Sequence, residues 1–380
     1  MNDPEPRGEY LLVACQAGAE DVVAMRMAQA LPGSTRGAWR RGVVTFRLPP
    51  GLDPSPADLD RLRDSIVVAR TLFRCYGQIR WADEAGKLAA LGERLPAARF
   101  DAVHLFPRDL RALAAADVVA DMPRVATAAG LAAAFPEATL GIARPGDLVL
   151  DCLSDGDDRW WIGWHRASSP STCWPGGLHP RPLPGDKVSR AWLKLDEAIA
   201  SFGVEFREGQ HACELGAAPG GACQRLLESG LEVVGIDPAL VDPVVAALPG
   251  FMQWRKRARD VPLRDLRGFE WVVADMNIDP TSTLEAVGRV VTAPGSRASG
   301  IIATLKIPDW SRAAGLDAWL GQFRCWGFTP QARQLSTGGR EVCVVALRTG
   351  PRRSRRGGQG VARESGGIKR ARPARRRPDR

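Results

Sequence analysis

Two lysines and two acids occupy positions from which they could act on one small molecule: Lys194, Asp275, Lys306 and Glu341. Asp275 follows a predicted strand over residues 271–274, and Lys306 follows another over 301–305. In an open α/β sheet, strand ends on one edge face the same crevice. A desolvated lysine can lose its proton, and a charged one can stabilise a developing oxyanion. The set therefore predicts a reactive site at this edge of the sheet.

The choice of lysine over arginine supports this prediction. Only six of the 52 basic residues are lysine, so this chain uses arginine almost everywhere. The guanidinium of arginine stays protonated in proteins, whereas the amine of lysine can be deprotonated. Lysine at both candidate positions indicates that arginine would not serve there. Each charge taken alone would be interpreted as an ordinary surface residue.

A glycine-rich loop supplies the second half of the candidate site. The loop Gly216-Ala-Ala-Pro-Gly-Gly221 joins a predicted strand, Ala212–Leu215, to a predicted helix, Ala222–Ser229, and Asp237 follows the next strand. Residue 218 is alanine, so the dinucleotide pattern Gly-x-Gly-x-x-Gly is missing, and no Gly-Lys-Ser/Thr marks a phosphate loop. A nucleoside ligand without pyrophosphate fits better, and S-adenosylmethionine is the commonest such ligand. Asp237 would bind its ribose hydroxyls.

Alternating strands and helices predict the fold class. The second half predicts a doubly wound parallel sheet with an antiparallel strand at its end. Its first helix is expected to begin with Ser189 as N-cap, and its last strands near residues 332–335 and 341–347. In the first half, a β-α-β-α-β order over residues 10–75 predicts a small ferredoxin-like sandwich, with helices at 19–31 and 58–68.

The middle of the chain gives weaker signals. Helices are predicted at 87–95 and 107–117. Two strands, 148–152 and 159–164, are predicted to form a hairpin. We interpret the acidic segment between them, 154–158, as a plain turn rather than a calcium loop. Trp160, Trp161, Trp164 and Trp174 are expected to pack in the core rather than to stack on bases.

Charge and cysteine usage bound the function classes. Residues 350–380 hold 12 of the 52 basic residues and only two acids, so the rest of the chain is nearly neutral. This tail is expected to be disordered, either as a solubility tail or as an arm that binds nucleic acid. Eight cysteines without C-x-x-C, with only four histidines, predict buried thiols and no metal site. A start without a signal pattern and the lack of long apolar runs predict a cytoplasmic protein without membrane contact.

Together these residues carry a resemblance to a known family. The second half resembles the FtsJ-type ribose 2′-O-methyltransferases, whose Lys-Asp-Lys-Glu tetrad matches the motifs SRAWLKLDE, VVADM, ATLK and REV. The segments SPSTCWPGG and ARQL…REV resemble the RlmM-type large-subunit rRNA methyltransferases. The resemblance implies an S-adenosylmethionine-dependent methyltransferase acting on a cytidine of large-subunit rRNA, with RNA as partner and a monomer favoured.

The same resemblance implies domains and site residues. The domains would be 1–80 (ferredoxin-like), 81–166 (THUMP-like, RNA-binding), 167–187 (linker), 188–348 (methyltransferase) and 349–380 (Arg-rich tail). Lys306 would take or orient the hydroxyl proton, made neutral by burial and by crowding from Lys194. Asp275 would hold Lys306 and the sulfonium, and Glu341 would position Lys194. The cofactor would contact Ser189, Glu214, Gly216, Ala217, Ala218, Pro219, Gly220, Gly221, Asp237, Asp260 and Asp275.

Two departures from the family pattern leave alternatives open. Ala222 stands where the family often has tryptophan, and the acid that contacts adenine has no clear counterpart, Asp260 being the nearest. A catalytically inactive RNA-binding or ribosome-assembly factor with the same fold is one alternative, and a methyltransferase acting on another RNA is a second. A nicotinamide dehydrogenase is disfavoured by the glycine pattern.

Overall fold

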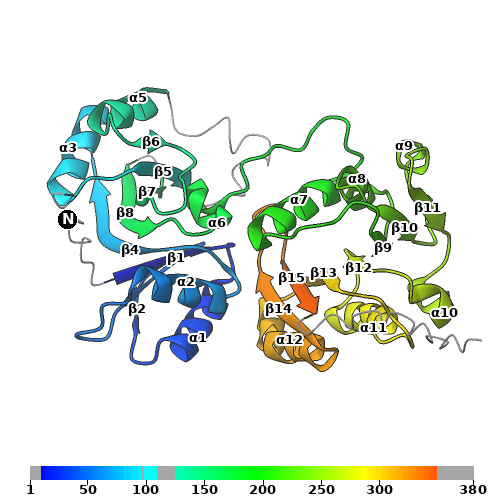
Figure 1. Cartoon of the computed structure of the whole chain (residues 1–380). Helices are drawn as coiled ribbons and strands as arrows, with labels where there is room; N and C mark the ends of the chain where they lie inside the picture. Colours follow the sequence, from blue (N-terminus) through cyan, green and yellow to red (C-terminus); the bar gives the residue numbers. More distant parts are fainter. Residues whose placement is uncertain (1–9, 82, 96–97, 109–124, 157, 349–380) are drawn as a thin grey trace, which may run out of the picture. The chain divides into compact units, whose positions relative to one another are not determined.

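The computed structural model describes residues 10–81, 83–95, 98–108, 125–156 and 158–348. These residues form two β-sheets with helices packed on them (Figure 1). The predicted helix at 107–117 lies largely outside the described residues, and so does the Arg-rich tail. No helix of the described ranges is long and apolar enough to cross a bilayer.

The first sheet has eight strands in the order β2-β3-β1-β4-β8-β7-β5-β6. Its strands are β1 (Tyr10–Cys15), β2 (Thr35–Arg40), β3 (Val43–Arg47), β4 (Ala69–Arg80), β5 (Ala102–Pro107), β6 (Thr139–Leu140), β7 (Leu148–Ser154) and β8 (Arg159–Arg166). Its helices are α1 (Glu20–Ala30), α2 (Pro56–Ser65), α3 (Glu84–Arg94) and α5 (Val125–Ala134).

The expected ferredoxin-like arrangement gains one strand. The order β1-α1-β2-β3-α2-β4 includes β2, which the sequence did not predict because all six of its residues are exposed and none of the usual apolar alternation is present. Pairing with β3 holds this strand at the sheet edge. Beyond β4 the sheet continues into β8, so residues on both sides of position 80 share one sheet.

The second sheet has seven strands in the order β11-β10-β9-β12-β13-β15-β14, which confirms the predicted doubly wound fold. Its strands are β9 (His211–Leu215), β10 (Glu232–Ile236), β11 (Phe251–Trp254), β12 (Trp271–Ala274), β13 (Gly300–Lys306), β14 (Phe328–Arg333) and β15 (Glu341–Arg348). Its helices are α7 (Ala191–Phe202), α8 (Gly221–Glu228), α9 (Pro243–Ala246), α10 (Leu263–Leu266), α11 (Pro280–Val291) and α12 (Leu316–Cys325), with 3₁₀ turns η3 (Ala258–Asp260) and η4 (Trp310–Gly315).

Local sequence accounts for where these elements start and stop. Apolar runs such as Ile301–Leu305 form strands buried on both faces, as parallel sheets require. Helix α11 begins where the Asp279 side chain accepts a hydrogen bond from Ser282 N, and Pro280 follows the cap. Helix α7 ends at Gly203, whose left-handed backbone (φ 61°) suits glycine. Helices α7 and α8 cover one face of the sheet, and α11 and α12 cover the other (Figure 1).

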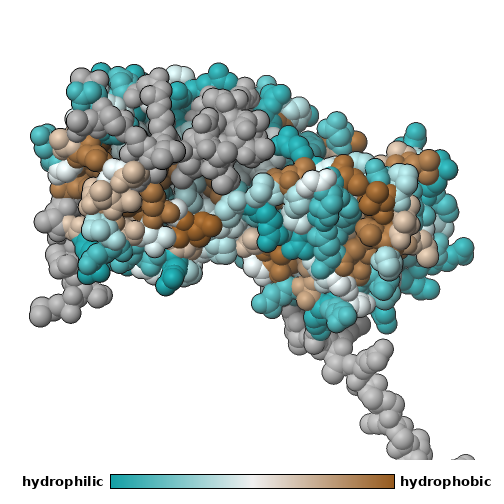
Figure 2. Space-filling view, turned by 90° about the horizontal axis from the view of Figure 1, so that it is seen from above, coloured by the Kyte–Doolittle hydropathy of each residue, from teal (hydrophilic) through white to brown (hydrophobic). Residues whose placement is uncertain are grey.

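The predicted linker, residues 167–187, is partly packed. It contains the short helix α6 (Pro170–Cys173) and the 3₁₀ turn η2 (Pro175–Gly177), and Cys173, Trp174 and Leu178 in it are buried. The four tryptophans of the middle region are buried, which confirms their role in packing. Seven of the eight cysteines are buried as well, and Cys325 is exposed. At the β11 end of the second sheet, hydrophobic residues reach the surface (Figure 2), among them Leu240, Val244 and Met252.

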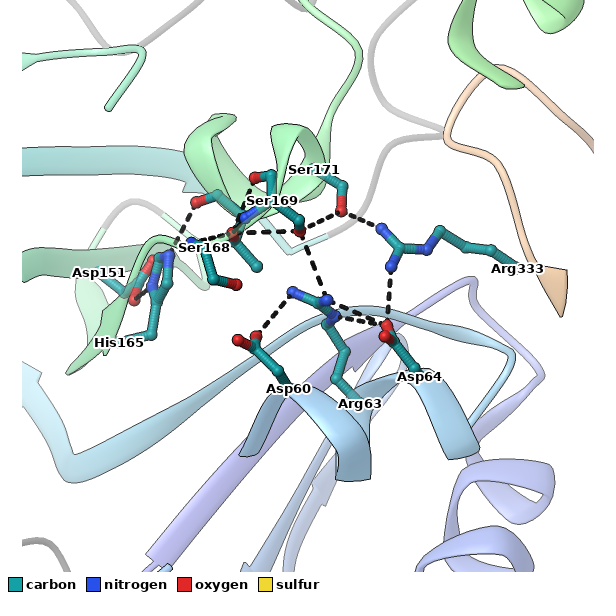
Figure 3. Close-up of polar contacts among 10 residues, drawn as sticks. Asp60, Arg63, Asp64, Asp151, His165, Ser168, Ser169, Ser171 and Arg333 are labelled. Carbon is teal, nitrogen blue, oxygen red and sulfur yellow. Dashed lines mark hydrogen bonds and ion pairs between the residues drawn. The ribbon is translucent and has the colours of Figure 1, made fainter. Parts of the chain in front are cut away.

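The two sheets are joined by apolar and polar contacts. One continuous cluster of buried hydrophobic residues includes side chains of β1, α1 and α2 together with side chains of β12, β13 and α12. At its edge, Arg333 at the end of β14 donates to Asp64 of α2 at 2.8 Å and to the Ser171 hydroxyl of α6 (Figure 3). Arg63 contacts the same carboxylate at 3.0 Å. Burial first, and then the neighbouring Arg63, lower the pKa of Arg333 to about 10, so it remains a cation at neutral pH.

We predict that Arg333→Met destabilises the protein. The substitution keeps the apolar stem and removes the donors to Asp64 and Ser171, so the free energy of unfolding should fall by about 1–2 kcal/mol. This figure is already reduced for solvent screening of the ion pair, because the Asp64 side chain is about half exposed. Denaturant unfolding measures this. Arg324→Met, at an exposed position of α12, is the matched control and should change little. Equal stability of the two variants would contradict a stabilising role for the Arg333 contact.

Candidate active site

Strand order brings the four predicted catalytic residues to one edge of the second sheet. Asp275 follows β12, and Lys306 ends the adjacent parallel strand β13. Strand β15 runs antiparallel to β13, so its first residue, Glu341, lies directly opposite Lys306. Lys194 comes from α7, which packs on this sheet. An antiparallel neighbour is what allows a residue at the start of a strand to join residues at strand ends.

The two lysines and two carboxylates contact each other alternately, and we call them the quartet. Lys306 Nζ lies 2.9 Å from Asp275 Oδ1 and 2.5 Å from Glu341 Oε2. Lys194 Nζ forms an ion pair with Asp275 Oδ2 and lies 3.3 Å from Glu341 Oε1. Each carboxylate therefore bridges both amines. Glu341 holds both lysines rather than Lys194 alone.

Electrostatics in the quartet favour the charged forms of Asp275 and Lys306. Burial would raise the pKa of Asp275, but the two lysines outweigh it and leave that pKa below its ordinary value. Burial would likewise lower the pKa of Lys306, but Asp275 and Glu341 outweigh it and raise that pKa. A neutral Lys306 is disfavoured in this arrangement of side chains, because two carboxylates contact its amine.

A hydrogen-bonded loop fixes the relation between Lys194 and Glu341. Glu197, one turn after Lys194 on α7, is buried and accepts hydrogen bonds from Ser336 N at 2.7 Å and from Thr337 N at 2.8 Å. These residues belong to the loop that leads into Glu341. On the other side, Gln334 N donates at 2.8 Å to the carbonyl of Val67, in the turn between α2 and β4. The loop is thus held from both halves of the chain, so the first half helps to place Glu341.

Asp275 also borders a cleft of about 660 Å³. Four of the predicted cofactor residues line it: Gly216, Ala218, Asp237 and Asp275. The remaining lining residues are Ile236, Pro238, Arg257, Ala258, Arg259, Met276, Asn277, Ile278, Ser282, Glu285, Ala286 and Arg289. Sequence reasoning missed Met276, Asn277 and Ile278, although they directly follow Asp275 at a strand end and so fall under the same rule that selected it.

The glycines of the loop are required by close approach. At Gly216 (φ 80°) an added Cβ would lie 2.6 Å from the Met276 side chain, and at Gly221 it would lie 2.2 Å from Ser189 Oγ. Ser189 is therefore packed against the loop, but it is not the N-cap of α7 as predicted. Arg190 holds that position because the helix begins one residue later, at Ala191.

The Asp237 carboxylate is fixed before any ligand arrives. Ala218 N donates to its Oδ2 at 3.1 Å, and Ala239 N donates to its Oδ1 at 2.8 Å. Both donors are backbone groups, so they set the direction of the carboxylate. Because a carboxylate can accept further hydrogen bonds, it can still receive ribose hydroxyls.

The other predicted cofactor residues are not among those that line the cleft. Within the glycine-rich loop, three of them are buried and Pro219 is exposed: the buried ones are Ala217, Gly220 and Gly221. Asp260, in η3, is exposed and lies 3.9 Å from Arg259, which does border the cleft. Glu214 is fully buried, and its carboxylate accepts a hydrogen bond from the Cys223 thiol at 2.8 Å. Its position beneath the loop supports the loop rather than reaching the cleft.

The cleft fits the chemistry of S-adenosylmethionine. Ile236, Ala258 and Ile278 offer apolar surface for an adenine ring, and the oriented Asp237 carboxylate suits ribose hydroxyls. The Asp275 carboxylate, shared between cleft and quartet, suits a cationic sulfonium. Within the described residues, therefore, the cleft offers partners for the adenine, the ribose and the sulfonium of that molecule.

A separate polar cluster lies in the core of the first sheet. His104, Asp151 and His165 are buried, and their ligand-type atoms lie within 4.8 Å of one another. His165 contacts Asp151 Oδ2 through Nδ1 at 2.5 Å and the Thr172 carbonyl through Nε2 at 2.8 Å (Figure 3). Both ring nitrogens of His165 are therefore engaged by the protein. The cluster ties β7 and β8 to the segment that carries Ser171.

We predict that Glu214→Gln removes a pH dependence of stability. Burial, reinforced by the charges of Asp275 and Asp237, raises the pKa of Glu214 from 4.5 to about 8. The folded protein then binds a proton that the unfolded chain releases above pH 4.5, so stability falls as pH rises between about 4.5 and 8, by up to about 1.4 kcal/mol per unit.

Chemical unfolding of the wild type and of Glu214→Gln across this range measures the effect. The difference between them should grow in favour of the variant as pH rises. Glu232→Gln, at an exposed position of β10, is the control. A constant difference would show that Glu214 does not change its protonation on folding.

Comparisons with known proteins agree with this geometry. Residues 187–294 match the FtsJ-like methyltransferase family model. A ribosomal RNA large subunit methyltransferase M of Halorhodospira halophila is 27% identical over 355 residues, covering 90% of this chain and 97% of the relative. Its counterpart in Xanthomonas campestris pv. campestris strain B100 is 30% identical over 240 residues, covering 58% and 67%.

Among solved structures, TrmN from Thermus thermophilus is 15% identical and covers 90% of this chain and 99% of its own, with a TM-score of 0.35. That score is too low to support an argument about the site. The sequence relatives carry the assignment: the chain belongs to the ribosomal RNA large subunit methyltransferase M family.

Proposed function

We propose that this protein transfers a methyl group from S-adenosylmethionine to a ribose 2′-hydroxyl of RNA, on a cytidine of large-subunit ribosomal RNA. The observation that carries the proposal is the quartet, in which Asp275 both contacts the two lysines and borders the cofactor cleft. This places amines that can handle a hydroxyl next to a cleft that fits the methyl donor. The names of the sequence relatives supply the RNA class.

The chain's own residues would align the acceptor and handle its proton. S-adenosylmethionine, when bound, supplies a methyl group already activated by a sulfonium. Asp237 and the glycine loop would hold the nucleoside part, so that the methyl group points toward Asp275 and the lysines. Lys194 would stabilise negative charge on the acceptor oxygen as it loses its proton.

Lys306 would accept that proton in its minor neutral form. Because the pKa of Lys306 is raised, its neutral amine is scarce at pH 7. The same raised pKa makes that amine a stronger base when it does form. After transfer, the proton rests on the amine between Asp275 and Glu341, where two carboxylates stabilise the ammonium. The step needs no covalent intermediate on the enzyme.

The first half of the chain would bind the RNA. We propose the domains 1–80 (ferredoxin-like), 81–166 (THUMP-like) and 188–348 (methyltransferase), with residues 167–187 as the connection. The boundary at 167–187 is supported because the strands of 10–166 and those of 211–348 belong to different sheets. The strands on both sides of position 80 share one sheet, so the first two domains would form one body. The Arg-rich segment 349–380 would add phosphate contacts, which carry no sequence information.

We predict that Lys306→Arg loses more than nine-tenths of the turnover, while the affinity for S-adenosylmethionine stays within a few-fold. Arginine keeps the positive charge but cannot give up its proton, so the base is lost and the cofactor contacts remain. Single-turnover methylation of ribosomal RNA, together with cofactor binding by calorimetry, measures both.

The chain offers a matched control. Lys187 is also held by two carboxylates, Asp186 at 2.6 Å and Glu228 at 2.7 Å, but does not border the cleft. Lys187→Arg should retain nearly full turnover. If Lys306→Arg kept more than about a tenth of the activity, a loss of under about 1.4 kcal/mol in transition-state stabilisation, Lys306 would not be the base.

We predict that Asp237→Ala raises the KM for S-adenosylmethionine much more than it lowers kcat. A carboxylate on ribose hydroxyls binds ground state and transition state about equally, and losing such binding appears in KM. Steady-state kinetics at saturating RNA separate the two constants. Asp242→Ala, which removes another carboxylate that accepts a backbone N–H nearby, is the control. A large loss of kcat at unchanged cofactor affinity would assign Asp237 another role.

A further inference from the structure

The edge of the first sheet presents an exposed tryptophan among arginines. Every residue of β2 is exposed, and Trp39 on it remains 49% exposed. Arg36 lies 5.8 Å from the centre of the Trp39 ring and Arg40 is the next residue after it. A half-exposed indole flanked by arginines offers the kind of surface on which proteins stack nucleobases.

Trp39 borders a hollow of about 390 Å³ that is separate from the cofactor cleft. Its lining comes from both halves of the chain: Ala17, Gly18, Glu20, Trp39 and Arg41 from the first, and Trp310 and Arg340 from the second. Two indoles and two guanidinium groups thus meet at one hollow although they are far apart in the sequence.

The hollow adjoins the quartet through neighbouring residues of the chain. Arg340 immediately precedes Glu341, and its carbonyl accepts a hydrogen bond from Ile307 N, next to Lys306, at 2.7 Å. Trp310 begins η4, four residues after Lys306. The cofactor cleft, by contrast, is bordered by Asp275 and Met276. The quartet therefore links the two cavities through adjacent residues.

The walls of the hollow are held in place by a buried carboxylate. Glu20 is 5% exposed, and its oxygens accept hydrogen bonds from Gly18 N at 3.0 and 2.9 Å and from Gly42 N at 2.5 Å. These bonds fix the two turns that carry Gly18 and Arg41. Gly18 has a φ of 96°, and an added Cβ there would lie 3.5 Å from Trp310. The Glu20 carboxylate thus accepts hydrogen bonds from the backbone, and the other large lining side chains are two indoles and two guanidinium groups.

We propose that this hollow binds an unpaired nucleobase of the RNA substrate, one that flanks the methylated ribose, with the base stacked on Trp39. Aromatic faces and arginine planes are what proteins use to hold splayed-out bases, and arginines also meet the flanking phosphates. The hollow would thereby set which ribose reaches Lys306. This inference rests on the proposed RNA substrate.

The test uses the full-length protein and an RNA fragment that it methylates, with 2-aminopurine placed in turn at each nucleotide flanking the target. Trp39→Ala should weaken RNA binding by about 5- to 150-fold, the range that corresponds to roughly 1–3 kcal/mol per stacked base. The KM for S-adenosylmethionine should not change. Trp39→Phe should restore most of the RNA affinity. With the wild type, binding should quench the fluorescence of 2-aminopurine at one flanking position, and Trp39→Ala should remove that quenching.

Leu263→Ala, at an exposed apolar residue of α10 in the methyltransferase half, is the matched control and should leave RNA affinity unchanged. If Trp39→Ala and the wild type showed the same RNA affinity and the same quenching, the inference would be overturned. The proposed function would still stand in that case, because the wild type methylates the RNA. Methylation of a base rather than of a ribose by the wild type, with the Trp39-dependent quenching present, would overturn the proposed function and support the base site.

Discussion

The structure depends most on one constraint: four charges of alternating sign must share a small volume at the edge of a sheet. Lys194, Asp275, Lys306 and Glu341 neutralise each other pairwise, so none of them is buried without a partner. Removing any one would leave like charges close together. The antiparallel insertion of β15 beside β13 satisfies the constraint, because it sets Glu341 opposite Lys306. The charge balance also explains why the resting lysine is protonated, since its two carboxylates stabilise the ammonium more than burial opposes it.

The first half of the chain contributes to that site through backbone contacts as well as through any RNA that it binds. The loop between β14 and β15 donates hydrogen bonds to the Glu197 carboxylate of α7 on one side. On the other side it donates one to the carbonyl of Val67, in the turn before β4. Arg333 anchors the start of the same loop to Asp64 and Ser171. These contacts tie the position of Glu341 to the first half of the chain.

Much of the fold could be predicted from the sequence, because local patterns determine it. Strands such as 271–274 and 301–305, the glycine loop and the acids at strand ends all follow from apolar runs and turn residues. Strand β2 could not be predicted, since its six exposed residues owe their conformation to pairing with β3. The protonation of Lys306 could not be predicted either, because it depends on which carboxylates reach the amine. Trp39 and Trp310 meet only in the folded chain, so no local pattern marks their hollow.

The most direct test of the proposed reaction is the position of the methyl group on the product. Large-subunit ribosomal RNA lacking the modification is incubated with the full-length protein and S-adenosylmethionine labelled in its methyl group, and the labelled nucleotide is mapped after alkaline hydrolysis. We expect one labelled site, a cytidine whose 3′ linkage resists alkali because its 2′-oxygen is methylated. Label on a base, with the linkage still cleaved by alkali, would contradict the role of the quartet in deprotonating a ribose hydroxyl.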